Sequence, residues 1–291
     1  MEKIERDFTL LTACFAHGAY QSQDINRPEL RPASVKGQIR WWYDKLNPPS
    51  YVAKTRASDP LFGRVGKDSQ AGRVSIRLVE RDVGSIEKTD FMPHKEDERD
   101  GRNRRKGGGA KNAIPAGSSY TLHISERREG LTEGQEASLK DAVDAWLLLG
   151  GIGQRSNRAA GSVWPDDAPQ TAVDFILKSE NLSEGDRFSP VLLPALDPGL
   201  NEREIRHICG DFLASTAFSS CQEPFGRIKP KRKPSNLKLK AVKLDGELGI
   251  VAVWDKQEQA TSNLIAGIRI LKNHSNPRRI ADLLDSVQDQ F

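Results

Sequence analysis

The sequence has few cysteines and no long apolar run. Cys14, Cys209 and Cys221 are odd in number and far apart, which excludes a disulfide framework and the paired spacing of a zinc site. No segment approaches the roughly 18 apolar residues needed to span a bilayer, and the first residues lack the apolar stretch of a signal peptide. We therefore expect a soluble, cytoplasmic protein that works without a metal, a cofactor or a membrane.

Net charge is also small. The 44 Lys and Arg residues nearly balance the 40 Asp and Glu residues, and the formal charge is +4. Any strongly cationic surface must therefore be local. The 291 residues are enough for two domains of roughly 100–200 residues each.

Apolar periodicity predicts an α+β domain over residues 1–165. The expected elements, in chain order, are a strand at 7–15, a helix from Ser34 to Leu46, strands at 72–80 and 117–126, a helix at 135–149 and a strand from Val163. This order is typical of a ferredoxin-like or RRM-like domain. Residues 94–113 are charged, rich in glycine and without apolar periodicity, so we expect a flexible insertion there, either a hairpin extension or a disordered loop.

A linker at Pro165–Pro169 separates this domain from a second one, residues 166–291. The expected elements are a strand at 172–177, a helix at 202–218, a hairpin at 237–254 that turns at Asp245-Gly246, and helices at 264–271 and 276–287. The order of elements repeats that of the first domain less regularly. We therefore predict two related ferredoxin-like domains rather than one.

Paired cations lie on the first predicted helix. If Val35, Ile39 and Trp42 face the core, then Lys36 and Arg40 share an exposed face. Arg31 precedes this helix and Trp41 lies on its third face. Phosphate contacts by Lys and Arg beside a stacking aromatic ring are how single strands are held. A solvated helix face with Trp41 under a loop explains the pattern equally well, and in either case alanine at both cations should leave the fold intact.

A glycine-rich segment runs from Gly150 to Val163. Gly151 and Gly153 would let a sugar–phosphate chain approach closely, and Arg155 and Arg158 could bind phosphate oxygens in pairs. The segment lacks the Gly-Lys-Ser/Thr ending of a P-loop and the third glycine of a dinucleotide fingerprint. A connection that uses glycine only for turns is the alternative.

A third cationic feature spans residues 226–243. It has eight basic residues and no acidic one. Most sequences of this kind are simply solvated runs of charge. The complete absence of acidic residues here favours a cationic arm that binds a polyanion. The densest part of the arm is Lys231, Arg232 and Lys233.

The sequence supports catalytic residues less strongly than it supports the three cationic features. The five histidines show no metal-ligand spacing. His17, after the first strand, could act as a general base in metal-independent RNA cleavage, and Asp24 could orient a metal or a ribose hydroxyl. Single residues of this kind are more often members of a hydrogen-bonded loop.

Several motifs resemble the RAMP superfamily of CRISPR effector subunits, and within it the first-numbered RAMP subunit of Cmr (type III-B) complexes. They cover most of the first domain and return once in the second. The motifs are Thr12-Ala-Cys-Phe, Gly18-Ala, the stretch from Pro28 through Arg31-Pro-Ala-Ser-Val-Lys-Gly-Gln-Ile-Arg-Trp-Trp, Leu61-Phe-Gly, Gly150-Gly-Ile-Gly-Gln-Arg and Arg232-Lys-Pro-Ser-Asn-Leu.

The resemblance implies two ferredoxin-like domains in a subunit that holds the 3′ part of a guide RNA beside another RAMP subunit and helps to capture target RNA. It also implies that target cleavage belongs to the backbone subunit. Two motifs depart from the family pattern. Tyr20 stands where the family has an aspartate, and Ala160 stands where a bulky residue is common.

The leading hypothesis is therefore a non-catalytic RNA-binding subunit of an RNA-guided ribonuclease complex in antiviral defence. Its three separated cationic features would converge into one trough, and base pairing would supply specificity. A metal-independent endoribonuclease that processes guide RNA is the alternative. A scaffold whose basic surface contacts only proteins is the third possibility.

Overall fold

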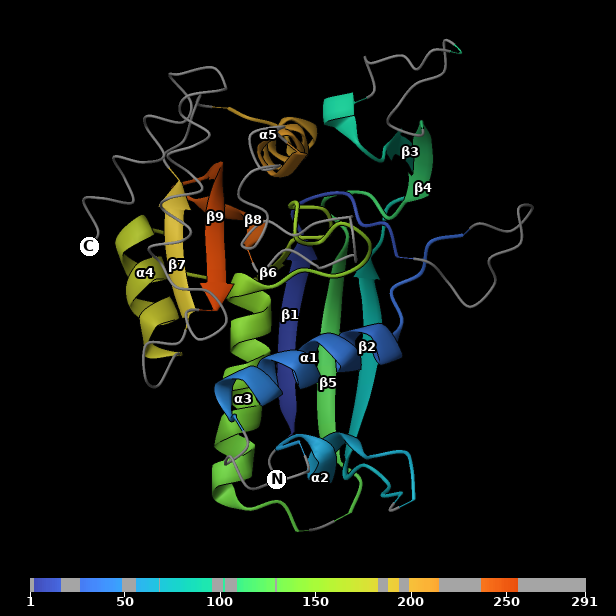
Figure 1. Cartoon of the computed structure of the whole chain (residues 1–291), viewed down its shortest axis with the longest axis vertical. Coiled ribbons are helices and arrows are strands. Elements are labelled where there is room, and N and C mark those ends of the chain that lie inside the picture. The colour runs from blue at the N-terminus through green and yellow to red at the C-terminus, as the bar shows by residue number, and fades with distance from the viewer. Residues whose placement is uncertain are drawn as a thin grey trace.

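The computed structural model of the chain describes residues 3–16, 27–48, 56–67, 69–95, 102, 109–128, 130–182, 188–193, 199–214 and 237–255. It is a mixed α/β structure with antiparallel sheets (Figure 1). No helix in the described part of the chain is long and apolar enough to cross a bilayer.

Four antiparallel strands form the first sheet. They are β1 (Ile4–Leu10), β2 (Val74–Asp82), β5 (Ser119–Glu126) and β6 (Val163–Pro165), in the spatial order β2-β5-β1-β6. Phe8 of β1 lies opposite Tyr120 of β5 and Pro165 of β6. Burial alternates along β1 as a period of two requires. The predicted strand at 7–15 leaves the sheet after Leu10, and Cys14 and Phe15 form only isolated bridges.

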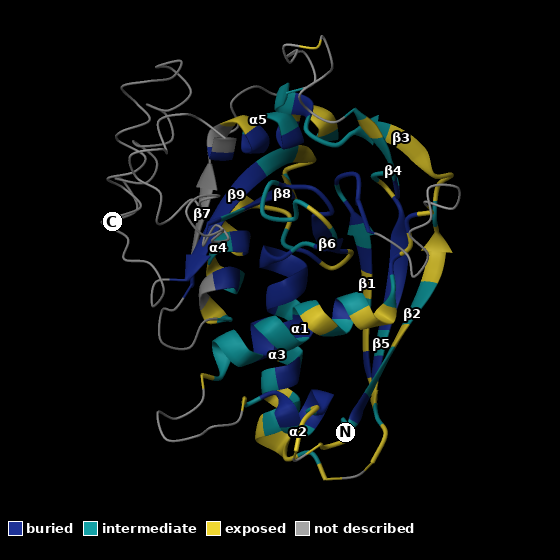
Figure 2. Cartoon of the chain, turned by 45° about the vertical axis from the view of Figure 1, so that its right-hand side comes forward, coloured by how far each residue is buried: buried dark blue, intermediate teal, exposed yellow. Residues whose placement is uncertain are grey.

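Helices α1 (Pro32–Leu46) and α3 (Glu133–Leu149) cover one face of this sheet (Figures 1 and 2). The predicted core stripe of α1 is confirmed, because Val35, Ile39 and Trp42 are fully buried. The helix begins at Pro32, two residues before the predicted Ser34, since proline suits the first helical position.

Shorter elements interrupt this half of the chain. Helix α2 (Asp59–Phe62) follows α1, strand β3 (Glu87–Asp90) pairs antiparallel with β4 (Ala110–Ala113), and η1 (Pro93–Lys95) is a 3₁₀ turn. Of the two alternatives for the insertion at 94–113, this pairing of β3 with β4 supports a hairpin extension at its base. Residues 96–101 and 103–108 lie outside the described residues. Strand β4 was not predicted because its sequence is mostly polar, and only Ala113 of the strand is buried.

A second sheet belongs to the second half. Its strands are β7 (Phe188–Leu193), β8 (Lys238–Leu244) and β9 (Glu247–Asp255), in the order β7-β9-β8. The predicted hairpin is confirmed: Asp245 and Gly246 have φ of +51° and +82°, as a tight turn between twisted strands requires. Helix α5 (Glu202–Ala214) confirms the predicted helix over these residues, and positions 215–218 lie outside the described residues. The helices predicted after residue 255 lie outside the described residues.

Helix α4 (Ala172–Asn181) stands where a strand was predicted at 172–177. Thr171 caps the helix, because its Oγ1 accepts the Asp174 N–H at 3.2 Å and donates to the Asp174 carboxylate at 2.8 Å. Phe175 is buried, whereas Val173 and Leu177 are 67% and 54% exposed. The alternation of apolar residues predicted a strand. The Thr-x-x-Asp sequence at Thr171, which is typical of a helix N-terminus, was overlooked.

Strand β8 carries lysines into the interior. Lys240 is 2% exposed, and its Nζ donates to the Leu147 carbonyl near the end of α3 at 2.5 Å. The Lys238 Nζ lies 3.6 Å from the centroid of the Trp41 ring. The prediction of a cationic arm across 226–243 therefore does not hold for these two lysines, because a buried strand turns them inward. Lys243 is exposed.

The buried Lys240 makes stability depend on pH. Burial lowers the pKa of this amine well below its usual 10.5. The unfolded chain then binds a proton that the folded chain lacks, so the free energy of unfolding rises with pH from the lowered pKa up to about 10.5. Relative to Lys240→Met, the wild type should gain up to about 1.4 kcal/mol per pH unit in this interval. Urea unfolding of both proteins across alkaline pH measures the difference, and parallel pH profiles would contradict the assignment.

Candidate nucleic-acid interface

The glycine loop, residues 150–162, folds back on itself beside the end of β1. Gly151 pairs with Ser162 across the base of the loop. Gly153 has φ of +88°, and a Cβ there would lie 3.1 Å from the Phe15 carbonyl oxygen. These two predicted site residues therefore allow a close approach of the chain to itself, which gives the loop its shape.

Hydrogen bonds from both halves of the chain hold this loop. Thr12 Oγ1 donates to the Ala159 carbonyl at 2.5 Å and accepts the Ser162 N–H at 3.0 Å. On the other side, the Ala159 N–H donates to the Leu239 carbonyl at 2.8 Å, and the Leu239 N–H donates to the Asn157 carbonyl at 3.2 Å. The loop is thus fixed between the end of β1 and strand β8.

Arg155 and Arg158 bring uncompensated positive charge to this loop. The Arg155 Cζ lies 5.3 Å from the Phe91 ring centroid, and the Lys111 Nζ lies 3.8 Å from the same centroid. Burial, with Arg158 and then Arg206 as smaller causes, lowers the pKa of Arg155 to about 10, and burial also lowers the pKa of Arg158. The Arg155 Nη2 is buried and finds no hydrogen-bond partner among the described residues. Within the described ranges, neither loop arginine forms an ion pair with a carboxylate.

His94 lies in the same cluster. Both of its ring nitrogens are buried without a hydrogen-bond partner in the described part of the chain. Burial first, then Arg155, Arg158 and Lys95, lower the pKa of His94 to about 3, so it is neutral at pH 7. A Cβ on Gly210 of α5 would overlap the histidine ring. We call the following residues the glycine-loop cluster: Phe91, His94, Lys95, Lys111, Arg155 and Arg158.

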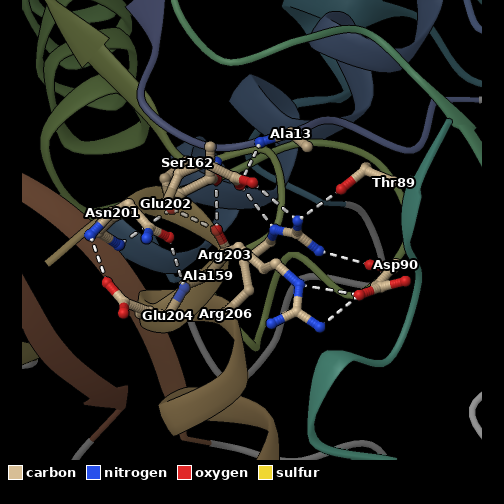
Figure 3. Close-up of polar contacts among 12 residues, drawn as sticks. Ala13, Thr89, Asp90, Ala159, Ser162, Asn201, Glu202, Arg203, Glu204 and Arg206 are labelled. Atoms are coloured by element: carbon tan, nitrogen blue, oxygen red, sulfur yellow. Dashed lines mark hydrogen bonds and ion pairs between the residues drawn. The ribbon is translucent and has the colours of Figure 1, made fainter. Parts of the chain in front are cut away.

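Helix α5 ties the β3–β4 pair to the end of β1 (Figure 3). Arg206 donates to the Glu202 carboxylate at 2.7 and 2.8 Å and to the Asp90 carbonyl at 2.6 Å. Glu202 also accepts the Ala13 N–H at 3.1 Å, and Arg203 pairs with the Asp90 carboxylate at 2.5 Å. Arg203 and Arg206 have carboxylate partners, whereas no described carboxylate pairs with Arg155 or Arg158. The network of α5 therefore sets the position of the cluster and adds no unpaired charge to it.

The predicted pair on α1 is only partly exposed. Arg40 donates to the Asp59 carboxylate at 2.5 Å and to the Gly63 carbonyl at 3.0 Å, and the Arg40 and Asp59 side chains are 26% and 8% exposed. Lys36 is half-buried, and burial, followed by Arg40 and Arg127, lowers its pKa. We expected alanine at both positions to leave the fold intact. The structure does not support this for Arg40, because its side chain joins α2 to α1. RNA contact by either residue stays a prediction.

We expect Arg40→Ala to destabilise the fold. The change leaves the buried Asp59 carboxylate without its partner and costs roughly 1–3 kcal/mol. Thermal and urea unfolding measure the loss, with Lys36→Ala as the matched removal of one positive charge from the same helix. Equal stability of the two variants would show that the Arg40–Asp59 pair does not hold α2 in place.

Other predicted residues are placed less favourably for a ligand. Arg31 precedes α1 and is half-buried, and its Nε finds no hydrogen-bond partner among the described residues. Trp41 is half-buried, with its ring edge-on to Trp42 at 5.0 Å and the Lys238 ammonium over its face. Part of the ring predicted to stack on a base is therefore already covered.

The described contacts divide the predicted residues into two groups instead of one trough. Arg155 and Arg158 influence each other, as do Lys36 and Arg40. Helix α2 lies at one end of the first sheet, and α5 with β3 and β4 lies at the other (Figures 1 and 2). The remaining predicted residues lie outside the described part of the chain: His17, Asp24, Lys231, Arg232 and Lys233.

The open face of the first sheet does not resemble an RNA-binding RRM surface. Arg81 pairs with Asp7 at 2.7 Å and with Asp166 at 2.8 Å, and His123 lies 3.0 Å from Glu5. RRM sheets hold RNA by stacking bases on aromatic side chains. Here charges of both signs compensate one another, so this face offers no net attraction for a polyanion.

Four members of the glycine-loop cluster were not predicted as site residues: Phe91, His94, Lys95 and Lys111. His94, Lys95 and Lys111 lie at the ends of the insertion that we expected to be flexible. The only signal for them was the positive charge of that stretch. Nothing in the sequence shows that β3, η1 and β4 carry these residues to the glycine loop, about 60 positions from His94.

Comparison with known families identifies the superfamily of the chain. The family model of the RAMP superfamily matches residues 7–164, which is more than half of the chain and includes α1 and the glycine loop. The chain belongs to the RAMP superfamily. The resemblance inferred from the motifs is thus confirmed. No curated protein matches this RAMP sequence significantly.

Solved structures of other proteins are similar to this RAMP protein in fold. Cmr1 from Pyrococcus furiosus superposes with a TM-score of 0.55 and 15% identity over 88% of each chain. A chain of the type III-B Cmr-beta complex bound to cognate target RNA gives a TM-score of 0.53 and 12% identity, covering 86% of this chain and 94% of that chain. A chain of Cmr-beta with target RNA and AMPPnP gives 0.50 and 11%, covering 98% of both. At these identities the likeness concerns the fold.

Proposed function

We propose that this RAMP protein is a non-catalytic RNA-binding subunit of an RNA-guided type III-B (Cmr) effector complex. It would hold the 3′ region of the guide RNA beside another RAMP subunit and help to capture target RNA in antiviral defence. Membership of the RAMP superfamily and a fold similar to Cmr1 and to chains of Cmr-beta support this proposal.

One observation carries the RNA-binding part of the proposal. Arg155 and Arg158 are more than half withdrawn from water beside other cations, and no described carboxylate compensates them. Withdrawing an unpaired charge from water is costly unless a partner binds it. A phosphate group between the two guanidinium groups would supply that partner and would relieve their mutual repulsion.

The rigid loop suits an RNA backbone rather than a base sequence. A fixed cationic loop can bind phosphates by charge and shape, whereas base pairing with the guide supplies specificity. The run Lys231, Arg232 and Lys233, outside the described residues, would add further phosphate contacts. Lys36 on α1 would contribute a second contact region.

We further propose two ferredoxin-like domains, residues 1–165 and 166–291. The order β2-β5-β1-β6 with α1 and α3 on one face supports this for the first. In the second, the three described strands and α5 fit part of the same pattern. One hydrophobic cluster includes Phe8 and Trp146 of the first half and Val251 of the second, so the two units would share a core contact.

Binding of labelled single-stranded RNA to the purified chain at several salt concentrations tests this function. With about four phosphate contacts, the logarithm of the affinity should fall with the logarithm of salt with a slope near −3. An affinity independent of salt would contradict the mechanism. Incubation of the same RNA in EDTA tests the endoribonuclease alternative, since discrete cleavage that His17→Ala abolishes would establish it. Tight association with partner subunits and no RNA crosslinks would establish a scaffold.

A further inference from the structure

The Leu61-Phe62-Gly63 motif precedes a loop, residues 64–70 without residue 68 in the described part, whose role the glycine-loop cluster does not explain. Leu61 and Phe62 are buried. Gly63 has φ of +85°, and a Cβ there would lie 2.8 Å from the Gln70 carbonyl. Arg64 and Gln70 exchange two backbone hydrogen bonds of 2.9 Å each. These contacts fix the two ends of the loop, Arg64 and Gln70, against each other and next to α2.

This loop and α1 enclose a groove of about 650 Å³. Among the described residues, Lys36, Arg40, Arg56 and Arg64 line it together with Asp59, which pairs with Arg40. A second hollow of about 340 Å³, which includes Trp41, shares Arg40 and Arg56 with the first. The two hollows therefore form one path along α1.

The electrostatics of this path favour an anion. Burial lowers the pKa of Lys36, and Arg40 and Arg127 lower it further by repulsion. Two carboxylates line the path: Asp59 pairs with Arg40, and Asp44 in the second hollow accepts the Ser58 N–H at 3.0 Å. The basic residues of the described lining outnumber these two, so its net charge is positive. An extended path lined with point charges and arginine forks fits successive phosphates better than a single ion.

The groove also offers contacts for a base. Val65 is 97% exposed at its rim, and Gln70 is exposed beside it. A large apolar side chain fully in water gains by contact with a flat ring. The Gln70 amide can donate to and accept from a base edge. An acidic peptide could pair with the cations of the groove. It would lack a flat ring to cover Val65 and a base edge to hydrogen-bond with the Gln70 amide.

We propose that the groove between α1 and the 64–70 loop binds a segment of single-stranded RNA distinct from the RNA held at the glycine-loop cluster. Lys36, Arg56 and Arg64 contact phosphates, and Val65 and Gln70 contact one unpaired base. The proposal rests on the RNA-binding function proposed above. Two separate sites follow from the position of α2 and α5 at opposite ends of the first sheet (Figure 1). A guide strand and a target strand could then be engaged at different places on one subunit.

Calorimetric titration of the chain with a short single-stranded oligoribonucleotide tests the proposal. Wild type should bind two molecules per chain. Arg56→Gln with Val65→Ser should weaken only one of them, by about tenfold at physiological salt for one lost phosphate contact and the lost base contact. Arg64→Gln, added as a further change, should weaken the same site again. Lys67→Gln is the matched control, because Lys67 is an exposed lysine of the same loop outside the groove lining.

Each outcome separates the two proposals. If wild type binds a single oligonucleotide that the groove variants leave unchanged, the groove proposal is wrong and the glycine-loop function stands. If no RNA binds at either site, the function itself is wrong. If the groove binds an acidic peptide in place of RNA, the groove proposal is overturned. Circular dichroism of each variant confirms that the fold is retained.

Discussion

Arg155→Gln with Arg158→Gln should abolish most RNA binding without weakening the fold. The two guanidinium groups are the proposed phosphate ligands, and charged hydrogen bonds contribute about 1.5–3 kcal/mol each. Loss of both should reduce affinity for single-stranded RNA by at least about 100-fold and lower the salt slope by about 1.4. Fluorescence anisotropy across a salt series measures both quantities.

The effect on stability is expected to have the opposite sign. Both arginines are desolvated without a carboxylate partner among the described residues, and Arg155 has a backbone φ of +61°. Neutral glutamine removes the repulsion and the cost of desolvation, so the melting temperature should stay constant or rise. If the two arginines stabilised the fold, the glutamine variant would instead have a lower melting temperature.

A matched control removes the same charge elsewhere. Arg77 and Lys243 are both exposed and lie away from the cluster. Arg77→Gln with Lys243→Gln should leave RNA affinity within about twofold, since distant exposed charges are screened by salt. Equal losses of affinity in the two double variants would show that the affinity for RNA depends only on the total charge of the protein. That outcome would remove the specific role of the glycine loop.

Trp42→Ala should cost about 3–5 kcal/mol of the free energy of unfolding. Trp42 is fully buried, edge-on to Trp41 at 5.0 Å and 4.9 Å from Phe188 of β7. It thus joins α1 of the first half to the second sheet, and its removal leaves a cavity where the two meet. Urea unfolding followed by circular dichroism measures the loss.

Trp42→Phe serves as the graded control. It keeps an aromatic ring against Phe188 and removes an indole N–H that has no hydrogen-bond partner among the described residues. Its cost should therefore be well below that of alanine. If both variants unfold like the wild type, Trp42 does not carry the contact between the halves.

Much of the fold could be predicted from periodicity, because strong patterns survive tertiary packing. The stripe of α1 and the Asp-Gly turn between β8 and β9 depend on local rules, and both are confirmed. Helix α4 was mistaken for a strand because its alternating apolar residues include two that remain exposed. Lys240 was read as surface because charge patterns do not reveal that a strand is buried on both faces.

The site could be predicted only in part, because its decisive contacts are long-range. Arg155 was recognised by its glycine-rich surroundings. Its neighbours His94 and Lys111 arrive through the pairing of β3 with β4 and the contacts of α5. The pairing of Arg40 with Asp59 was missed because Asp59 lies 19 residues away, beyond the reach of helix-spacing rules.

The most direct test of the central claim is a map of ultraviolet crosslinks between single-stranded RNA and the whole chain, read by mass spectrometry. The account predicts that crosslinked peptides contain residues 91–95 and 151–158, and that Arg155→Gln with Arg158→Gln removes them. Crosslinks confined to the open face of the first sheet, around Arg77 and His123, would contradict it.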